Sequence, residues 1–162
     1  MIAFVVAVQF TGVFLVFLLF PIFVIPFLEA RFEERLPRTL PAKLRDFVLI
    51  YRYGPAVTSL IRDMERQRIS VVVLEEEESL ARRLRDRGLN VVLSRLEDES
   101  PLSEGLGGAR AMIANCADDE NEVVVLSARE SGFQGPIYVF VENPLHRKPI
   151  VLAGAKAAYS PK

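Results

Sequence analysis

Hydrophobic and polar positions divide the chain into two unlike parts. Residues 1–28 carry no charge, and Gln9 and Thr11 are their only clearly polar side chains. At about 1.5 Å per residue, a helix of this length exceeds the roughly 30 Å hydrocarbon core of a bilayer. The run has no basic start and no small-residue cleavage site, so it does not fit a signal peptide. It predicts a transmembrane helix, and the charged residues 29–45, with two prolines, predict a linker.

From residue 46 onward, short apolar runs alternate with amphipathic segments. The apolar runs predict strands at 46–51, 69–74, 90–94, 109–116, 136–141 and 155–160. The i, i+3, i+4, i+7 spacing, first-turn acids and glycine stops predict helices at 55–67, 77–87 and 118–132, and a weaker helix disturbed by Pro149 follows. Such alternation is typical of right-handed βαβ crossovers. The predicted fold class is therefore α/β, a Rossmann-like doubly wound parallel sheet over 46–162, preceded by one transmembrane helix.

The distribution of charge predicts how the chain is oriented in the membrane. All 20 basic and 21 acidic residues follow position 28 and are mixed in sign, so no basic face suggests a nucleic-acid partner. Five basic residues follow the apolar run closely: Arg31, Arg35, Arg38, Lys43 and Arg45. The positive-inside rule then predicts a single-pass protein of the cell membrane with its C-terminal domain in the cytoplasm. The lone Cys116 fits a reducing compartment and excludes an internal disulfide.

The stretch "LIYRYGPAVTSL" (49–60) is an apolar strand that turns on one glycine into a helix. Dinucleotide-binding units begin this way, with G-x-G-x-x-G for a tight turn, for approach of the pyrophosphate, and for helix–strand packing. Those three positions hold Arg52, Gly54 and Val57. Only the position that lets the pyrophosphate approach keeps its glycine. The turn position now carries a long cation, and the packing position carries a β-branched side chain. Glu75, which ends the second strand, is the expected partner of a ribose hydroxyl, or else it stabilises the start of the next helix together with Glu76–Glu78.

Four stretches carry a resemblance to a known family: "DFVLIYRYGPAVTSLIRDMERQRISVVVLEEEES", "RGLNVVLSRLEDESPL", "ARAMIANCADDENEVVVLSARE" and "GAKAAYSPK". In their order and spacing, residues 46–162 resemble the RCK domain (regulator of potassium conductance), also called the TrkA N-terminal domain. The resemblance implies a cytoplasmic ligand-sensing module of a potassium channel or transporter. The first 45 residues look like the pore-lining inner helix of such a channel and its linker. Because no segment resembles the selectivity filter or the C-terminal lobe, the chain is expected to be a fragment that cannot conduct potassium ions by itself.

The same resemblance implies a ligand site at the carboxyl edge of the sheet. Its candidate residues are Arg52, Tyr53, Gly54, Glu75, Arg95 and Asn115. Arg95 follows Ser94 where the family has "GD", and Asn115 ends the fourth strand. The cofactor stays open among NAD(H), ATP and ADP, but the altered glycine motif predicts poor binding of NAD. Two arginines would suit an anionic ligand, or would pair with acids and fill the site; for Arg52 the expected partner is Glu75 or a bound anion.

No catalytic apparatus is expected, because the sequence shows no nucleophile–base pair and no Walker lysine. The acids at 97–99 and 118–120 could hold a divalent cation or cap helices, and no metal site is predicted from them. The favoured function is the regulatory part of a potassium channel that acts with other subunits as a homo-oligomer, with dimeric RCK units and a tetrameric pore. A membrane-tethered nucleotide-dependent oxidoreductase is one alternative. The other is a purely structural assembly domain, which would show paired arginines and no open pocket.

Overall fold

The computed structural model divides the chain into two units, residues 1–35 and 36–162. It describes residues 36–40, 43–94 and 105–160, and in the first unit Gln9, Val13, Phe14, Phe17, Phe20, Ile22 and Ile25. Those seven residues are helical and exposed. Within the described part of the chain, no helix is long and apolar enough to cross a membrane. Most of the predicted membrane helix, residues 1–28, lies outside the described residues, as does much of the linker.

The second unit is built on a six-stranded sheet whose neighbouring strands are all parallel. Its elements in chain order are β1 (Phe47–Tyr51), α2 (Pro55–Arg66), β2 (Ser70–Glu75), α3 (Glu78–Asp86), β3 (Asn90–Leu93), η1 (Leu106–Gly108), β4 (Ala109–Ala114), α5 (Asp118–Glu130), β5 (Ile137–Phe140), η2 (Pro144–His146), α6 (Arg147–Leu152) and β6 (Ala157–Tyr159). The strand order is β3-β2-β1-β4-β5-β6. This confirms the predicted Rossmann-like sheet and places its switch point, where ligands bind in such folds, between β1 and β4.

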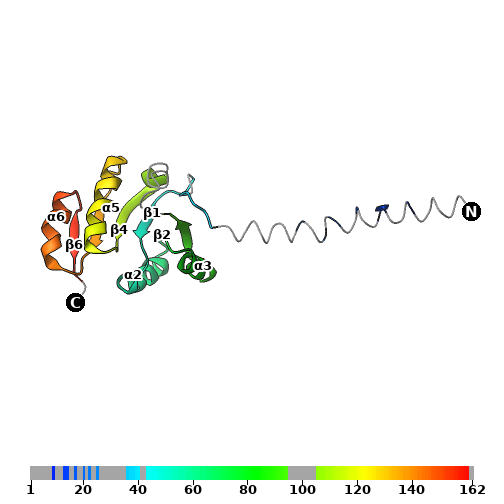
Figure 1. Ribbon diagram of the computed structural model, residues 1–162, viewed down its shortest axis with the longest axis horizontal. Helices are drawn as coiled ribbons and strands as arrows, with labels where there is room; N and C mark the ends of the chain where they lie inside the picture. The colour runs from blue at the N-terminus through cyan, green and yellow to red at the C-terminus, as the bar shows by residue number, and fades with distance from the viewer. Residues whose placement is uncertain are drawn as a thin grey trace, which may run out of the picture. The chain divides into compact units, whose positions relative to one another are not determined.

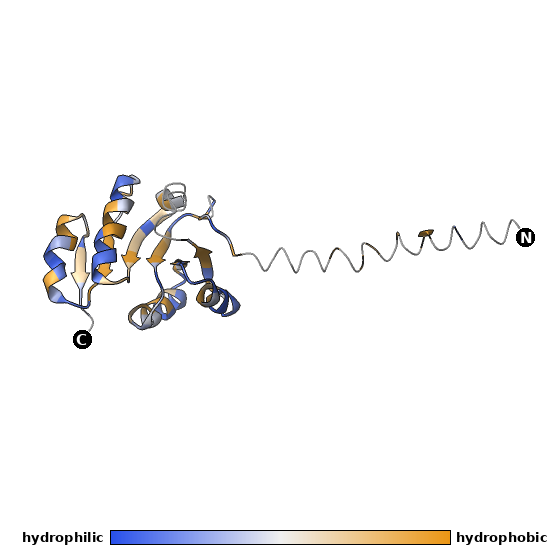
Figure 2. Ribbon diagram, in the orientation of Figure 1, coloured by the Kyte–Doolittle hydropathy of each residue, from blue (hydrophilic) through white to orange (hydrophobic). Residues whose placement is uncertain are grey.

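Two helical layers cover the sheet, with α2 and α3 on one face and α5 and α6 on the other (Figure 1). The strands are apolar along most of their length because both faces are covered (Figure 2). Along β1, Ile50 joins the core that contains Val57 of α2, and Tyr51 joins the core that contains Val124 of α5. Each such buried side chain contributes roughly 1.5–3 kcal/mol. The two cores hold the carboxyl ends of β1 and its neighbours in place.

Glycine ends α3 as the sequence predicts. Gly88 adopts the left-handed conformation, with a φ of 88°. Its N–H donates to the carbonyl of Arg85 at 2.8 Å, and the N–H of Leu89 donates to the carbonyl of Leu84 at 3.2 Å. These two bonds close the last turn of the helix, and α3 is thereby directed back into β3.

Candidate functional site

The turn from β1 to α2 keeps the shape of a glycine turn without its first glycine. Arg52 stands there in the left-handed conformation, with a φ of 65°, and its N–H donates to the carbonyl of Leu74 at 2.9 Å. That conformation costs a residue with a side chain about 1–2 kcal/mol. Gly54, two residues on, is extended and is required for space: a Cβ would lie 2.8 Å from Nδ2 of Asn115. The same Asn115 amide donates to the carbonyl of Arg52 at 3.4 Å.

The N-terminus of α2 offers little to an anion. Such sites work through free backbone N–H groups in the first turn of a helix. Pro55, the first residue of α2, has no N–H, and the N–H of Val57 donates to the carbonyl of Gly54 at 3.2 Å. The Val57 side chain, which stands at the position of the third glycine, is fully buried within the core. Of the first three residues of the helix, Ala56 alone has an N–H that the turn does not use.

Glu75 lies at the same edge of the sheet as Gly54, as predicted, but its carboxylate is engaged by the protein. The side chain is buried. One oxygen, Oε2, accepts the N–H of Tyr53 at 3.0 Å. The other, Oε1, accepts the N–H groups of Glu76 at 3.0 Å and Glu77 at 3.4 Å. A carboxylate has about four lone-pair positions, so these three bonds leave little capacity for a ribose hydroxyl.

The Arg52 guanidinium pairs with two other acids, and the expected pairing with Glu75 is wrong. Its Nη2 donates to Oε2 of Glu76 at 2.8 Å, and its Nη1 lies 3.0 Å from Oε2 of Glu120. The Tyr51 hydroxyl donates to the second oxygen of Glu76 at 3.1 Å. Glu75 is not the partner because its carboxylate faces the backbone of the turn. Sequence reasoning missed Glu76 and Glu120, which it treated as acids that favour helix starts.

The surroundings raise the pKa values of Arg52 and of the Tyr51 hydroxyl. Burial acts to lower the pKa of Arg52, but the negative groups around it outweigh burial and raise that pKa. Burial, and next to it the charge of Glu76, raises the pKa of the Tyr51 hydroxyl, which therefore stays protonated and donates. The Nε of Arg52 is buried and has no hydrogen-bond partner among the described residues. The cation is thus held by its two terminal nitrogens.

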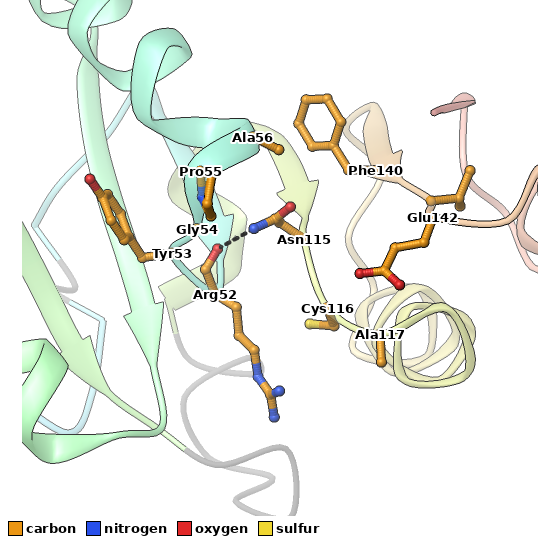
Figure 3. Close-up of a pocket in the computed structure, with 11 residues that line it drawn as sticks. Arg52, Tyr53, Gly54, Pro55, Ala56, Asn115, Cys116, Ala117, Phe140 and Glu142 are labelled. Carbon is orange, nitrogen blue, oxygen red and sulfur yellow. Dashed lines mark hydrogen bonds between the residues drawn. The ribbon is translucent and has the colours of Figure 1, made fainter. Parts of the chain in front are cut away.

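A cavity of about 610 Å³ opens beside this cluster. Its walls are three loops at the carboxyl edge, residues 52–56, 115–117 and 140–142. Figure 3 shows the Asn115 amide and the Glu142 carboxylate at this cavity, with the Phe140 ring nearby. A purely structural domain was expected to combine a paired arginine with no open pocket. The structure combines a paired Arg52 with an open pocket.

Asn121 of α5 positions two of the cavity walls, and sequence reasoning missed it. It is fully buried. Its Oδ1 accepts the N–H of Cys116 at 3.1 Å, while its Nδ2 donates to the carbonyl of Cys116 at 3.0 Å and to that of Phe140 at 2.9 Å. The signal that could have revealed it is an asparagine at an inward position of an amphipathic helix. Such a residue is buried only when its hydrogen bonds are satisfied.

The remaining candidates take structural roles or lie outside the described residues. Both carboxylate oxygens of Asp118 accept backbone N–H groups, from Glu142 and Asn143, each at 2.9 Å. Within the described ranges, no three metal-ligating side chains gather into a site. Burial raises the pKa of the Cys116 thiol to about 12, so it stays protonated at neutral pH. Arg95 and the acids at 97–99 lie outside the described residues.

A parallel sheet with a crevice at its switch point defines a Rossmann-type ligand-binding domain. The family model of the TrkA-N domain matches residues 48–161, and the chain belongs to that family. Residues 46–162 were assigned to this family from the sequence, and the match confirms that assignment.

Solved structures of the GsuK channel resemble the chain over most of its length. A structure described as the GsuK channel bound to NAD is 31% identical, with a TM-score of 0.78, and the match covers 95% of this chain and 28% of that one. The GsuK structure bound to ADP is 30% identical, with a TM-score of 0.79, and 96% and 42% are covered. The TrkA-N domain of the inner membrane protein ybaL from Escherichia coli, 22% identical over 73% of this chain and 89% of that one, shares the fold with a TM-score of 0.66. No curated protein matches. The chain therefore spans less than half of the channel chains that it resembles.

Proposed function

We propose that this chain is the regulatory part of a potassium channel subunit, in which a cytoplasmic RCK domain acts on a pore-lining helix. The observation that carries the proposal is the extent of the likeness to the GsuK channel. That likeness covers 95% of the chain, whereas the TrkA-N match spans only 114 of its 162 residues. The likeness therefore extends from the domain into the apolar N-terminal region. The membrane helix at 1–28 and the linker at 29–45 are parts of this proposal.

The ligand site of this subunit is an altered nucleotide site. Two GsuK structures are described as bound to NAD and to ADP, which makes a nucleotide the first class of ligand to test. In this chain, Pro55 removes an N–H from the helix that would receive a phosphate, and Glu75 is engaged by backbone N–H groups. These two features support weak binding of NAD and NADH. Arg95, a ligand candidate from the sequence that lies outside the described residues, keeps its proposed ligand role.

The proposed role is binding and gating, without catalysis. Cys116 is the one thiol that lines the cavity, and its raised pKa keeps it protonated. A ligand shifts a channel between two states only by the difference in its affinity for them. In the proposed assembly of identical subunits, closure of the crevice around a ligand would move the start of the domain. The linker would carry that movement to the membrane helix.

The membrane arrangement is tested by expressing the full chain with a fluorescent protein at its C-terminus, one that matures only in the cytoplasm. We expect fluorescent cells, a product that sediments with membranes through alkaline carbonate washing, and release by detergent. The matched control is residues 36–162 with the same fusion, which we expect in the supernatant. Recovery of the full chain in the supernatant would overturn the proposed membrane helix.

A further inference from the structure

We propose that the side chains of Arg52, Glu76 and Glu120 form a bridge at the crevice in place of a ligand. This bridge weakens the binding of dinucleotides. The inference rests on the proposed function and names the residues that regulate ligand entry. We refer to these three side chains as the Arg52 bridge. Arg52 takes the first glycine position of the motif, and Glu76 and Glu120 lie outside the motif.

The Arg52 bridge joins three loops that a ligand at the switch point would also join. Arg52 follows β1, Glu76 follows β2, and Glu120 lies in the first turn of α5, which follows β4. The 2.8 Å contact joins the ends of β1 and β2, and the 3.0 Å contact crosses the line between β1 and β4, where the strand order reverses. The side chains are only partly exposed, at 31% for Arg52, 27% for Glu76 and 37% for Glu120, so water weakens these ion pairs less than fully exposed ones.

Protein donors also satisfy the acids that would otherwise receive ligand hydroxyls. Arg52 donates to Glu76, and three backbone N–H groups donate to Glu75. A dinucleotide that enters the crevice must break some of these bonds or bind without them. Since a buried acceptor that loses its donor costs about 1–3 kcal/mol, more when it is charged, this replacement weighs against the ligand.

The positions of the charged groups at the site point the same way. Arg52 is shared by two glutamates, so both of its terminal nitrogens are engaged. The carboxylate of Glu142 lies at the cavity, and the described residues supply it with no hydrogen bond or ion pair. A pyrophosphate brought to α2 therefore finds Arg52 already committed to its own acids. Arg52 thus acts against phosphate here, although an arginine at such a position ordinarily favours it.

The test compares ligand binding by the full chain in detergent, using NADH and ADP as probes in calorimetric titrations. Glu120→Gln removes one acid of the bridge and leaves Nη1 of Arg52 free to meet phosphate, and Arg52→Gly removes the bridge and restores the first glycine. We expect each variant to bind NADH at least about tenfold more tightly than the unmodified chain. Arg66→Ala is the matched control, because among the described residues Arg66 pairs with its exposed helix neighbour Asp63 and lies outside the bridge, and we expect no change.

A second readout separates the bridge from a general loosening of the fold. Hydrogen exchange should become faster in the first turn of α5 and at residues 75–77 in both variants, with the core strands unchanged. If Arg52→Gly and Glu120→Gln bind NADH no better than the unmodified chain, or if Arg52→Gly binds it less tightly, the proposal is wrong. These affinities are measured on purified protein, so they test the Arg52 bridge separately from the membrane location. Either proposal can be wrong while the other holds.

Discussion

The polar groups of the loops are hydrogen-bonded in different ways on the two sides of the switch point. On the β1–β2 side, the polar ends of the strands bond to each other: Glu75 accepts from the backbone of the turn, and Arg52 pairs with Glu76 and, across the switch point, with Glu120 of α5. On the β4–β5 side, a single buried residue, Asn121, ties two loops together from behind and leaves a cavity in front of them.

The difference shows that an open site depends on where the polar bonds of its loops are made. Asn121 satisfies the backbone of Cys116 and Phe140 from inside the core, so the loops need nothing from the crevice. On the other side, Arg52 and Glu76 meet each other at the crevice. That part of the crevice is filled by side chains of the protein, while the cavity beside it stays open.

The largest effect on this comparison is expected from Asn121→Ala, which removes the support of the open side. Three hydrogen bonds are lost, and partly buried backbone groups of Cys116 and Phe140 lose their partner. We expect the free energy of unfolding to fall by about 3 kcal/mol. Chemical denaturation followed by circular dichroism measures it. Asn143→Ala, which removes one exposed cap bond to the N–H of Leu145, should cost about 1 kcal/mol or less. Equal losses of stability in the two variants would show that Asn121 supports its loops no more than an exposed cap residue supports its turn.

A smaller effect is expected from Glu75→Gln on the closed side. The amide keeps one oxygen, but its NH₂ group must face N–H donors that the carboxylate accepted. We expect a loss of about 2 kcal/mol and faster hydrogen exchange at the Tyr53 amide. Glu77→Gln serves as the control, since that side chain is 64% exposed and should change stability by less than about 0.5 kcal/mol. An unchanged exchange rate at Tyr53 would mean that Glu75 does not hold the turn.

The smallest effect concerns Cys116, which lies between the two sides. Burial raises the pKa of its thiol from the usual 9.0 to about 12. Since the folded state holds the proton more tightly than the unfolded state, the stability from this group is complete below pH 9.0 and is lost as the pH rises toward 12. We expect alkylation by iodoacetamide to accelerate up to about pH 12, and Cys116→Ala to reduce the alkaline loss of stability. A plateau in the alkylation rate near pH 9 would contradict the burial of this thiol.

The sequence by itself determined the order and type of the elements in the described domain. Apolar runs covered on both faces and helical spacing are local patterns, so β1 to β6 and the helices between them were predicted to within about two residues at most ends. Gly88 marked the end of α3 because only a residue without a side chain adopts its φ cheaply. The shared edge of Gly54 and Glu75 followed from the parallel order of the strands.

Only the tertiary structure decided which charges meet. Glu75 and Glu76 are neighbours at the end of one strand, yet one faces the backbone of the turn and the other faces Arg52. Glu120 reaches the same arginine from a helix 68 residues away, because the sheet order places β4 beside β1. No local sequence pattern predicts either pairing, since acids at the start of a helix are equally stable when they face water. The partners of a polar side chain are set by distance in space, and that distance exists only once the strands have paired.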